Sequence, residues 1–314
     1  MRKWLAVGIA LLLFPWLLSL LWMNVAGEKI EETDSEQVLA ESRGVSEKRI
    51  LMERDEIRTY MALEDYLPGV ILCQMDPDAP MEALKCQAVV ARTYICRMME
   101  GREEIQEEEL DLEYPGTMDR RILLEKEHAL KQLERCREAV QETSGMVMKW
   151  ENREILPLFH RMSAGRTRKG ADDFPYLQPV ESPWDAKADD AAARMEWSRA
   201  EFAQLVGQIP NVRTGDGTLS ADEIQIVEKD DSGYVLQVKI GAGTCSGEAF
   251  QYALGLPSCC YTLETDASSV RALVRGSGHG YGLSQNGAVG MAEEGWHWED
   301  ILHYYYKNIS IVSE

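Results

Sequence analysis

The stretch Gly276-Ser-Gly-His-Gly-Tyr-Gly-Leu-Ser-Gln-Asn-Gly-Ala288 carries five glycines, four of which alternate with other residues. Glycine costs backbone entropy in a helix or strand, and it is useful where the chain takes positive φ or another group approaches closely. These glycines surround His279 and are followed by a hydroxyl and an amide, Ser284 and Gln285. The pattern predicts part of a binding or catalytic site, with a glycine-rich surface turn as the alternative.

Three other segments, at 63–99, 159–167 and 176–185, place polar side chains near the ends of predicted elements. Trp and Tyr beside hydroxyl and amide donors suit a sugar, which offers an apolar ring face and polar edges. For Trp184, packing in the core is an equally good interpretation. The candidate residues of these segments are Lys85, Gln87, Arg92, Thr93, His160, Ser163, Arg166, Thr167, Ser182 and Trp184.

Helix and strand patterns alternate without βαβ order. Asp78 and Pro80 open a helix that Gly101 ends, with an apolar stripe at spacings of three and four. Further helices are predicted at 120–142, 198–206, 246–254 and 298–306. Hairpins are predicted from 146–150 with 155–160, and from 223–228 with 234–240. Helices and antiparallel hairpins in one domain indicate the α+β class.

The amino terminus predicts a membrane anchor. Residues 4–26 carry no charge and follow Arg2 and Lys3, and as a helix they reach about 34 Å, enough for a bilayer core. A cleaved signal peptide is the alternative, but the apolar run is long for one. We therefore expect a single transmembrane helix at 1–26, a polar tether at 27–55 and one domain at 56–312. The flanking charges predict a single-pass protein of the cell membrane with an extracytoplasmic domain.

Composition bounds the function. The chain has 314 residues, 45% of them hydrophobic, and a net charge of −20. Such acidity argues against nucleic acid as a partner, because phosphate binding relies on Lys and Arg. Seven cysteines leave at least one thiol unpaired, and their spacing lacks the paired pattern of a zinc site. We expect free, buried thiols, with a single disulfide as the alternative. We expect neither a metal nor a cofactor.

Taken together, the motifs resemble the SpoIID/LytB family, that of stage II sporulation protein D. The resemblance runs from about residue 56 to 309, in order and at family-like spacing. Any single motif is weak, whereas seven in register are specific. They are EDYLPGV, PMEALKCQAVVARTY, FHRMSAGRT, PYLQPVESPWD, ALGLPSCCYTL, SGHGYGLSQNGA and ILHYYYKN.

The resemblance implies a lytic transglycosylase of engulfment during sporulation, acting on peptidoglycan glycan strands stripped of their peptides. This reaction needs one carboxylic acid, unlike the pair that a hydrolase uses. The resemblance also implies that His160, Arg166, His279, Ser284 and Gln285 bind and orient the substrate. A Ser284–His279 nucleophilic pair lacks an orienting acid, and a His160–His279 zinc site lacks further ligands.

The sequence departs from the family at the catalytic position. Gln74 stands where the family has its glutamate, and an amide cannot deliver a proton at neutral pH. Asp76 is the candidate substitute acid, and Asp78 is a second one, with a turn or helix-capping role as the alternative for both. We therefore expect a glycan-recognising protein that cuts slowly or not at all. The alternative is a non-catalytic scaffold or amidase modifier, resembling the LytB side of the family and working beside other sporulation cell-wall hydrolases or membrane proteins.

Overall fold

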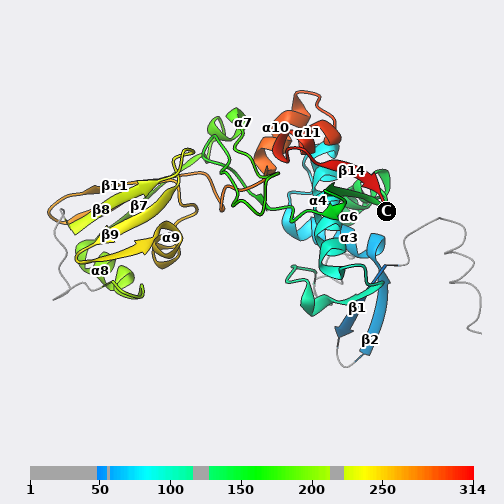
Figure 1. The fold of residues 1–314 in the computed structure, drawn as a ribbon, viewed down its shortest axis with the longest axis horizontal. Coiled ribbons are helices and arrows are strands. Elements are labelled where there is room, and N and C mark those ends of the chain that lie inside the picture. The colour runs from blue at the N-terminus through cyan, green and yellow to red at the C-terminus, as the bar shows by residue number, and fades with distance from the viewer. Residues whose placement is uncertain (1–47, 55–56, 116–126, 213–222) are drawn as a thin grey trace, which may run out of the picture. The chain divides into compact units, whose positions relative to one another are not determined.

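The computed structural model describes residues 48–54, 57–115, 127–212 and 223–314 (Figure 1). Residues from Glu47 to Glu314 form one compact unit. Within it, the buried apolar side chains gather in two main clusters, which we call the first core and the second core. The first core holds the helices that carry Gln74 and Gln87, and the second core is built from residues between 195 and 274.

Helix α4 (Met81–Met99) is the centre of the first core (Figure 1). Its start confirms the prediction from Asp78 and Pro80, and its end lies at Glu100, which takes a left-handed conformation with φ 50°. The apolar stripe of α4 is buried up to Ile95, and Met98 is partly buried, because other elements contact the helix on several sides. These neighbours are α3 (Leu63–Gln74), α6 (Glu127–Glu142), α10 (Gln285–Glu293), α11 (Trp298–Tyr305) and β4 (Met146–Trp150).

A small sheet lies at the amino-terminal side of the first core. In it β1 (Arg49–Arg54) pairs antiparallel with β2 (Ile57–Ala62) and parallel with β3 (Glu104–Gln106), which leads into the short helix η1 (Glu107–Glu109). Strand β1 takes up residues that the sequence assigned to the tether. Ile50 and Met52 of β1 are buried, which places this face of the sheet on the core.

The first predicted hairpin is confirmed at its turn and wrong at its second strand. Strand β4 pairs antiparallel with β5 (Arg153–Glu154) and, on its other side, with β14 (Ser310–Ser313). Glu151 and Asn152 both have positive φ, the geometry of a two-residue hairpin turn. Ile155 still donates its amide to the Met148 carbonyl. Residues 156–158 leave the hairpin, and β6 (Phe159–His160) instead pairs parallel with β13 (Leu283–Ser284).

The second core lies between two three-stranded antiparallel sheets and two helices. One sheet has the order β11-β12-β7 and the other β10-β9-β8. The predicted strand pair and both predicted helices are confirmed, with Ser198 and Glu201 forming the capping box and Gly255 ending the second helix at φ 63°. The elements are β7 (Ala192–Ser198), α8 (Arg199–Val206), β8 (Ile224–Lys229), β9 (Val235–Ile240), β10 (Gly243–Ser246), α9 (Gly247–Leu254), β11 (Tyr261–Thr265) and β12 (Ser269–Arg275).

Two predictions are corrected, the single transmembrane helix in the fold class and the single-pass membrane location. Across the ranges that the structure describes, no helix combines the length and the apolar character needed to cross a membrane. Helix α4 is 19 residues long, but it carries Glu82, Lys85, Arg92 and Arg97, and charged groups are costly in hydrocarbon. The predicted anchor at 1–26, the tether up to residue 47 and the first turns of the helix predicted at 120–142 lie outside the described residues.

Most of the cysteines behave as small apolar side chains. Five thiols are buried, and burial raises the pKa of each of them. A raised pKa keeps a thiol protonated and therefore unreactive at neutral pH. The five are Cys86, Cys96, Cys136, Cys259 and Cys260.

Candidate functional site

The glycine-rich stretch lies directly against the segment that carries His160. Gly276, Gly278, Gly280 and Gly282 all have positive φ, between 69° and 102°. A Cβ at Gly278 would lie 2.8 Å from the His160 Cβ, and one at Gly282 would lie 1.9 Å from the Leu158 carbonyl oxygen. The alternating glycines are therefore needed for close backbone approach as well as for their φ angles. The β6–β13 pair then joins the two motifs side by side.

The buried carboxylate of Asp185 ties three of the motifs together. It accepts hydrogen bonds from the Ser163 amide at 2.9 Å and the Ser163 hydroxyl at 2.5 Å. It also accepts from the Ser284 hydroxyl at 2.9 Å and the Asn286 amide at 3.1 Å. These four bonds offset the cost of burying a charge. Ser284 additionally caps α10 by accepting from the Gly287 amide, so it acts in the architecture and is not paired with His279.

Three glutamine side chains meet where α3, α4 and α10 come together. The Gln87 amide donates to the Gln74 side-chain oxygen at 2.7 Å. The Gln285 amide donates to the Gln74 backbone carbonyl at 2.7 Å and to the Gln87 side-chain oxygen at 3.3 Å. Gln87 is fully buried, whereas Gln74 is partly exposed. The Gln74 side chain, at the family's acid position, is thus held by the buried Gln87 and remains partly exposed to solvent.

Gln74 lines a cavity of about 180 Å³. This is smaller than pockets that enclose a drug-sized ligand, at ~300–1,000 Å³, so it suits one ring of a longer molecule. Most of its wall is apolar, from α4 and from residues 156–159. Its polar groups are Gln74, Tyr94, Asp111 and His279.

Asp111 is the one carboxylate among the residues that line this cavity. It follows Leu110, whose carbonyl accepts a hydrogen bond of 2.8 Å from the Tyr94 hydroxyl. Burial, and after it the nearby charge of Asp111, raises the pKa of Tyr94. Asp111 has φ 47° and is exposed. It comes from the acid-rich segment 100–113, to which the sequence analysis assigned no role.

Burial lowers the pKa of both motif histidines. His160 is buried, and its Nδ1 lies 3.0 Å from the Tyr281 carbonyl oxygen, to which it donates. Burial, and then the nearby His279, lower the pKa of His160 to about 3. His279 lines the cavity, its Nδ1 accepts from the Tyr281 amide at 3.0 Å, and partial burial lowers its pKa as well. His279 can therefore offer the cavity a hydrogen-bonding imidazole whose charged form is disfavoured.

Several predicted binding residues instead hold the architecture. Arg92 is 1% exposed and forms a bidentate pair with Glu64, both bonds at 2.7 Å. Lys85 pairs with Glu82 and Glu142, each at 2.6 Å. Thr93, Thr167 and Ser182 are buried and bond within the protein, in turn to the Val89 carbonyl, the Val180 amide and the Tyr305 hydroxyl.

The remaining predicted residues lie at or near the surface. Trp184 is partly buried and donates to Glu294 at 2.8 Å. Arg166 lies 3.4 Å from Glu181. Asp76 is exposed, its carboxylate accepts from the Asp78 amide at 3.0 Å, and it does not line the cavity. This turn role matches the structural alternative for Asp76.

Sequence reasoning missed Tyr94, Asp111 and Asp185 as site residues. Tyr94 is seven residues from Gln87 on α4, so it shares a face with Gln87, and this spacing could have revealed it. Asp185 ends the quoted motif PYLQPVESPWD, and an acid next to Ser182 and Trp184 in such a motif is a usable signal. Asp111 carried no local signal among its acidic neighbours.

Comparison with known proteins finds relatives in the family that the motifs resemble. A family model described as stage II sporulation protein matches residues 53–150. Stage II sporulation protein D of Bacillus subtilis (strain 168) is 31% identical over 261 residues, covering 79% of this chain and 74% of that protein. Its counterpart in Bacillus amyloliquefaciens is also 31% identical, with the same coverage. The amidase enhancer of Bacillus subtilis is 24% identical and covers 79% of this chain but 40% of its own length. The amidase enhancer is thus a more distant relative. The chain belongs to the family of stage II sporulation protein D, a family of sporulation proteins.

Proposed function

We propose that this protein binds peptidoglycan glycan strands stripped of their peptides in the cavity beside Gln74, and that it cleaves them slowly or not at all. The observation that carries the proposal is the Gln74 side chain, which Gln87 holds at the wall of a cavity that residues of three of the motifs line. The apolar wall suits a sugar ring face, and the polar groups Tyr94, Asp111 and His279 suit its hydroxyl and N-acetyl substituents.

Proton supply explains why slow cleavage is expected. In lytic transglycosylation an acid protonates the glycosidic oxygen, and the carboxylate then takes the proton of the sugar's 6-hydroxyl as that oxygen bonds to the anomeric carbon. The Gln74 amide can perform neither transfer. A missing general acid costs a factor on the order of 10²–10⁴ in rate.

Asp111 offers a residual route to the same chemistry. As a carboxylic acid, it would give its proton to the glycosidic oxygen while the bond to the anomeric carbon breaks. The 6-hydroxyl oxygen then bonds to that carbon and returns its proton to Asp111, so the carboxyl group is regenerated. Asp111 lines the cavity and Asp76 does not, and the Asp76 carboxylate already accepts from Asp78.

The test compares the native protein with Gln74→Glu, Asp111→Asn and the double variant on stripped strands. A carboxylate at position 74 accepts the same hydrogen bond from Gln87, so Gln74→Glu should raise release of 1,6-anhydro products about 10²- to 10⁴-fold. Any product from the native protein should disappear in Asp111→Asn. Absence of strand binding by the native protein and by Gln74→Glu alike would overturn the proposal.

A second candidate function is stimulation of a partner cell-wall hydrolase. The relationship to an amidase enhancer, together with the amide at position 74, favours a role in positioning the substrate for another enzyme. In this case the native protein should accelerate an added amidase on intact peptidoglycan, and Gln74→Glu should leave that acceleration unchanged. Strand cleavage by the native protein without any effect on the amidase would exclude this role.

A further inference from the structure

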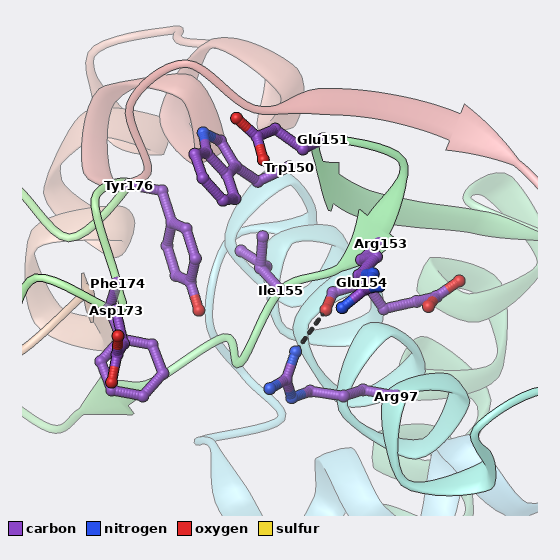
Figure 2. Close-up of a pocket in the computed structure, with 9 residues that line it drawn as sticks. All are labelled: Arg97, Trp150, Glu151, Arg153, Glu154, Ile155, Asp173, Phe174 and Tyr176. Carbon is purple, nitrogen blue, oxygen red and sulfur yellow. Dashed lines mark hydrogen bonds between the residues drawn. The ribbon is translucent and has the colours of Figure 1, made fainter.

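A second cavity, of about 500 Å³, lies next to the hairpin of β4 and β5 (Figure 2). In Figure 2 the side chains of Trp150, Ile155 and Tyr176 point toward one space, which Arg97 closes from the opposite side. Phe174 and Asp173 complete the wall from the loop that precedes Tyr176. None of these residues belongs to the site around Gln74, so the proposed function does not account for this cavity.

The walls of the second cavity are fixed by internal contacts. The Tyr176 hydroxyl accepts from the Leu156 amide at 2.9 Å, and the Tyr176 ring packs edge-on against Phe174 with centroids 6.2 Å apart. Arg97 donates to the Glu154 carbonyl at 2.6 Å, which connects α4 to the hairpin. A ligand therefore meets aromatic surfaces that are already ordered, which lowers the entropy cost of binding.

The chemistry of the lining favours a neutral, polyhydroxylated ligand. Arg97, Arg153, Glu151, Glu154 and Asp173 all line this cavity, and the Glu154 carboxylate is already paired with Lys149, so the lining has no excess of one charge that would select an anion or a cation. Carboxylates and guanidinium groups bond readily to neighbouring hydroxyls, and aromatic side chains offer a flat apolar surface to a ring face. An N-acetylated sugar has this combination of features.

The two cavities follow one another along the same two elements. Val90, Ala91 and Tyr94 of α4 line the cavity beside Gln74, and Arg97, three residues after Tyr94, lines the second one. This spacing keeps them on one face of the helix. From Ala91 to Arg97 the axial distance is about 9 Å, at 1.5 Å per residue.

The chain after the hairpin shows the same succession in the opposite direction. Ile155 lines the second cavity, and residues 156–159 line the cavity beside Gln74. Both cavities therefore have α4 and the segment 155–159 as walls, the arrangement that a linear polymer needs in order to reach both. This continuity selects an extended strand as the occupant over an unrelated small molecule.

We propose that the second cavity is a glycan subsite, which binds an N-acetylated sugar of the same strand that occupies the cavity beside Gln74. This subsite rests on the proposed function and adds a second contact between protein and strand, away from Gln74. Trp150 supplies the stacking surface, and Asp173 supplies hydrogen bonds to hydroxyl groups. The protein should consequently prefer long strands over short ones.

The experiment is calorimetric titration of the full chain with chito-oligosaccharides of two to six sugars, which are neutral probes of N-acetylated strands. Affinity of the native protein should rise on the order of tenfold between the short and long probes, the equivalent of ~1.4 kcal/mol. Trp150→Ala should remove this gain and leave the affinity for the disaccharide unchanged. Trp150→Phe, which keeps a ring face, should retain part of the gain.

Two further variants guard against loss of folding. Asp173→Ala alters an exposed side chain and should lower long-probe affinity several-fold without affecting the fold. Trp296→Ala is the matched control, because Trp296 is 38% exposed and lies outside both cavities, so its length dependence should equal that of the native protein. If strands bind but Trp150→Ala and Asp173→Ala keep the full length dependence, the subsite is refuted. If the native protein binds no probe and no stripped strand, the proposed function itself fails.

Discussion

The neutral state of His160 couples the stability of the site to pH. In the folded protein its pKa is lowered from 6.5 to about 3, mainly by burial. Between these two pH values the unfolded chain takes up a proton that the folded protein does not, so stability falls as the pH falls. Above pH 6.5 both states are neutral at this position, and the contribution is complete.

We therefore expect the free energy of unfolding to decrease as the pH is lowered from 6.5 toward 4, by at most ~1.4 kcal/mol per pH unit from this residue. His160→Asn keeps a donor for the Tyr281 carbonyl but does not titrate in this range. Urea unfolding at several pH values should show a shallower decrease for His160→Asn than for the native protein. Equal slopes would contradict the assignment of a neutral, buried imidazole.

Single residues also show where sequence analysis reaches its limit. The segments with strong local patterns carry Gln74, Gln87 and Gln285, which bond to one another in the structure, and His279, which lines the same cavity as Gln74. Arg92 was predicted to bind substrate, yet its guanidinium is buried against Glu64. Polarity in a motif does not reveal whether a side chain faces a ligand or a partner in the core, since the partner lies 28 residues away.

At the level of elements, the turn at Gly282 determines the position of the cavity wall. Gly282 has φ 69°, and an added Cβ would meet the Leu158 carbonyl at 1.9 Å. Leu158 lines the cavity beside Gln74. A side chain at position 282 would thus push this wall out of place.

Gly282→Ala should lower the free energy of unfolding by about 2–5 kcal/mol, the sum of ~1–2 for the left-handed backbone and ~1–3 for overpacking. Gly255→Ala is the matched control, because Gly255 has φ 63° but nothing within 4 Å of an added Cβ. It should cost only the backbone part, about 1–2 kcal/mol, and leave glycan affinity intact. Equal costs in urea unfolding would show that the close approach at Gly282 is unimportant.

Elements with complete local signals were predictable, and those without were not. The capping box at Ser198 and the glycine at 255 fixed their helices correctly. Helix α3 contains Pro68 in its interior, and this obscured it, because proline usually marks a first turn or a break. The pairing of β6 with β13 joins residues more than 120 positions apart, and no local pattern specifies such a partner.

At the scale of the molecule, the second core is connected to the site through Arg168. Residues 192–275 leave and return at one point, where β7 pairs with β12 and the Gly276 amide donates to the Ala191 carbonyl. Arg168 is buried and pairs with Asp230 at 2.7 Å, while the Tyr234 hydroxyl accepts from the Ala164 amide at 3.0 Å. These contacts link residues 192–275 to the segment 164–168, and they thereby stabilise the glycine-rich stretch.

The net charge of −20 leads to a prediction about ionic strength. Stripped glycan strands carry a carboxylate on every second sugar, so protein and strand repel each other at long range. Raising NaCl from about 10 to 150 mM shortens the screening length from ~30 to ~8 Å, and strand affinity should increase several-fold. Neutral chito-oligosaccharides should show less than about a twofold change, measured in the same titration. Weaker strand binding at higher salt would indicate recognition dominated by cationic side chains instead.

The four donors around Asp185 are supplied by residues on both sides of it in the chain. Ser163 is made before it, whereas Ser284 and Asn286 follow about a hundred residues later. During synthesis, this carboxylate consequently cannot be enclosed until Ser284 and Asn286 have been made. A product terminated ahead of residue 284 would leave an uncompensated anion in its interior, so premature stops anywhere upstream should yield chains that quality-control proteases remove.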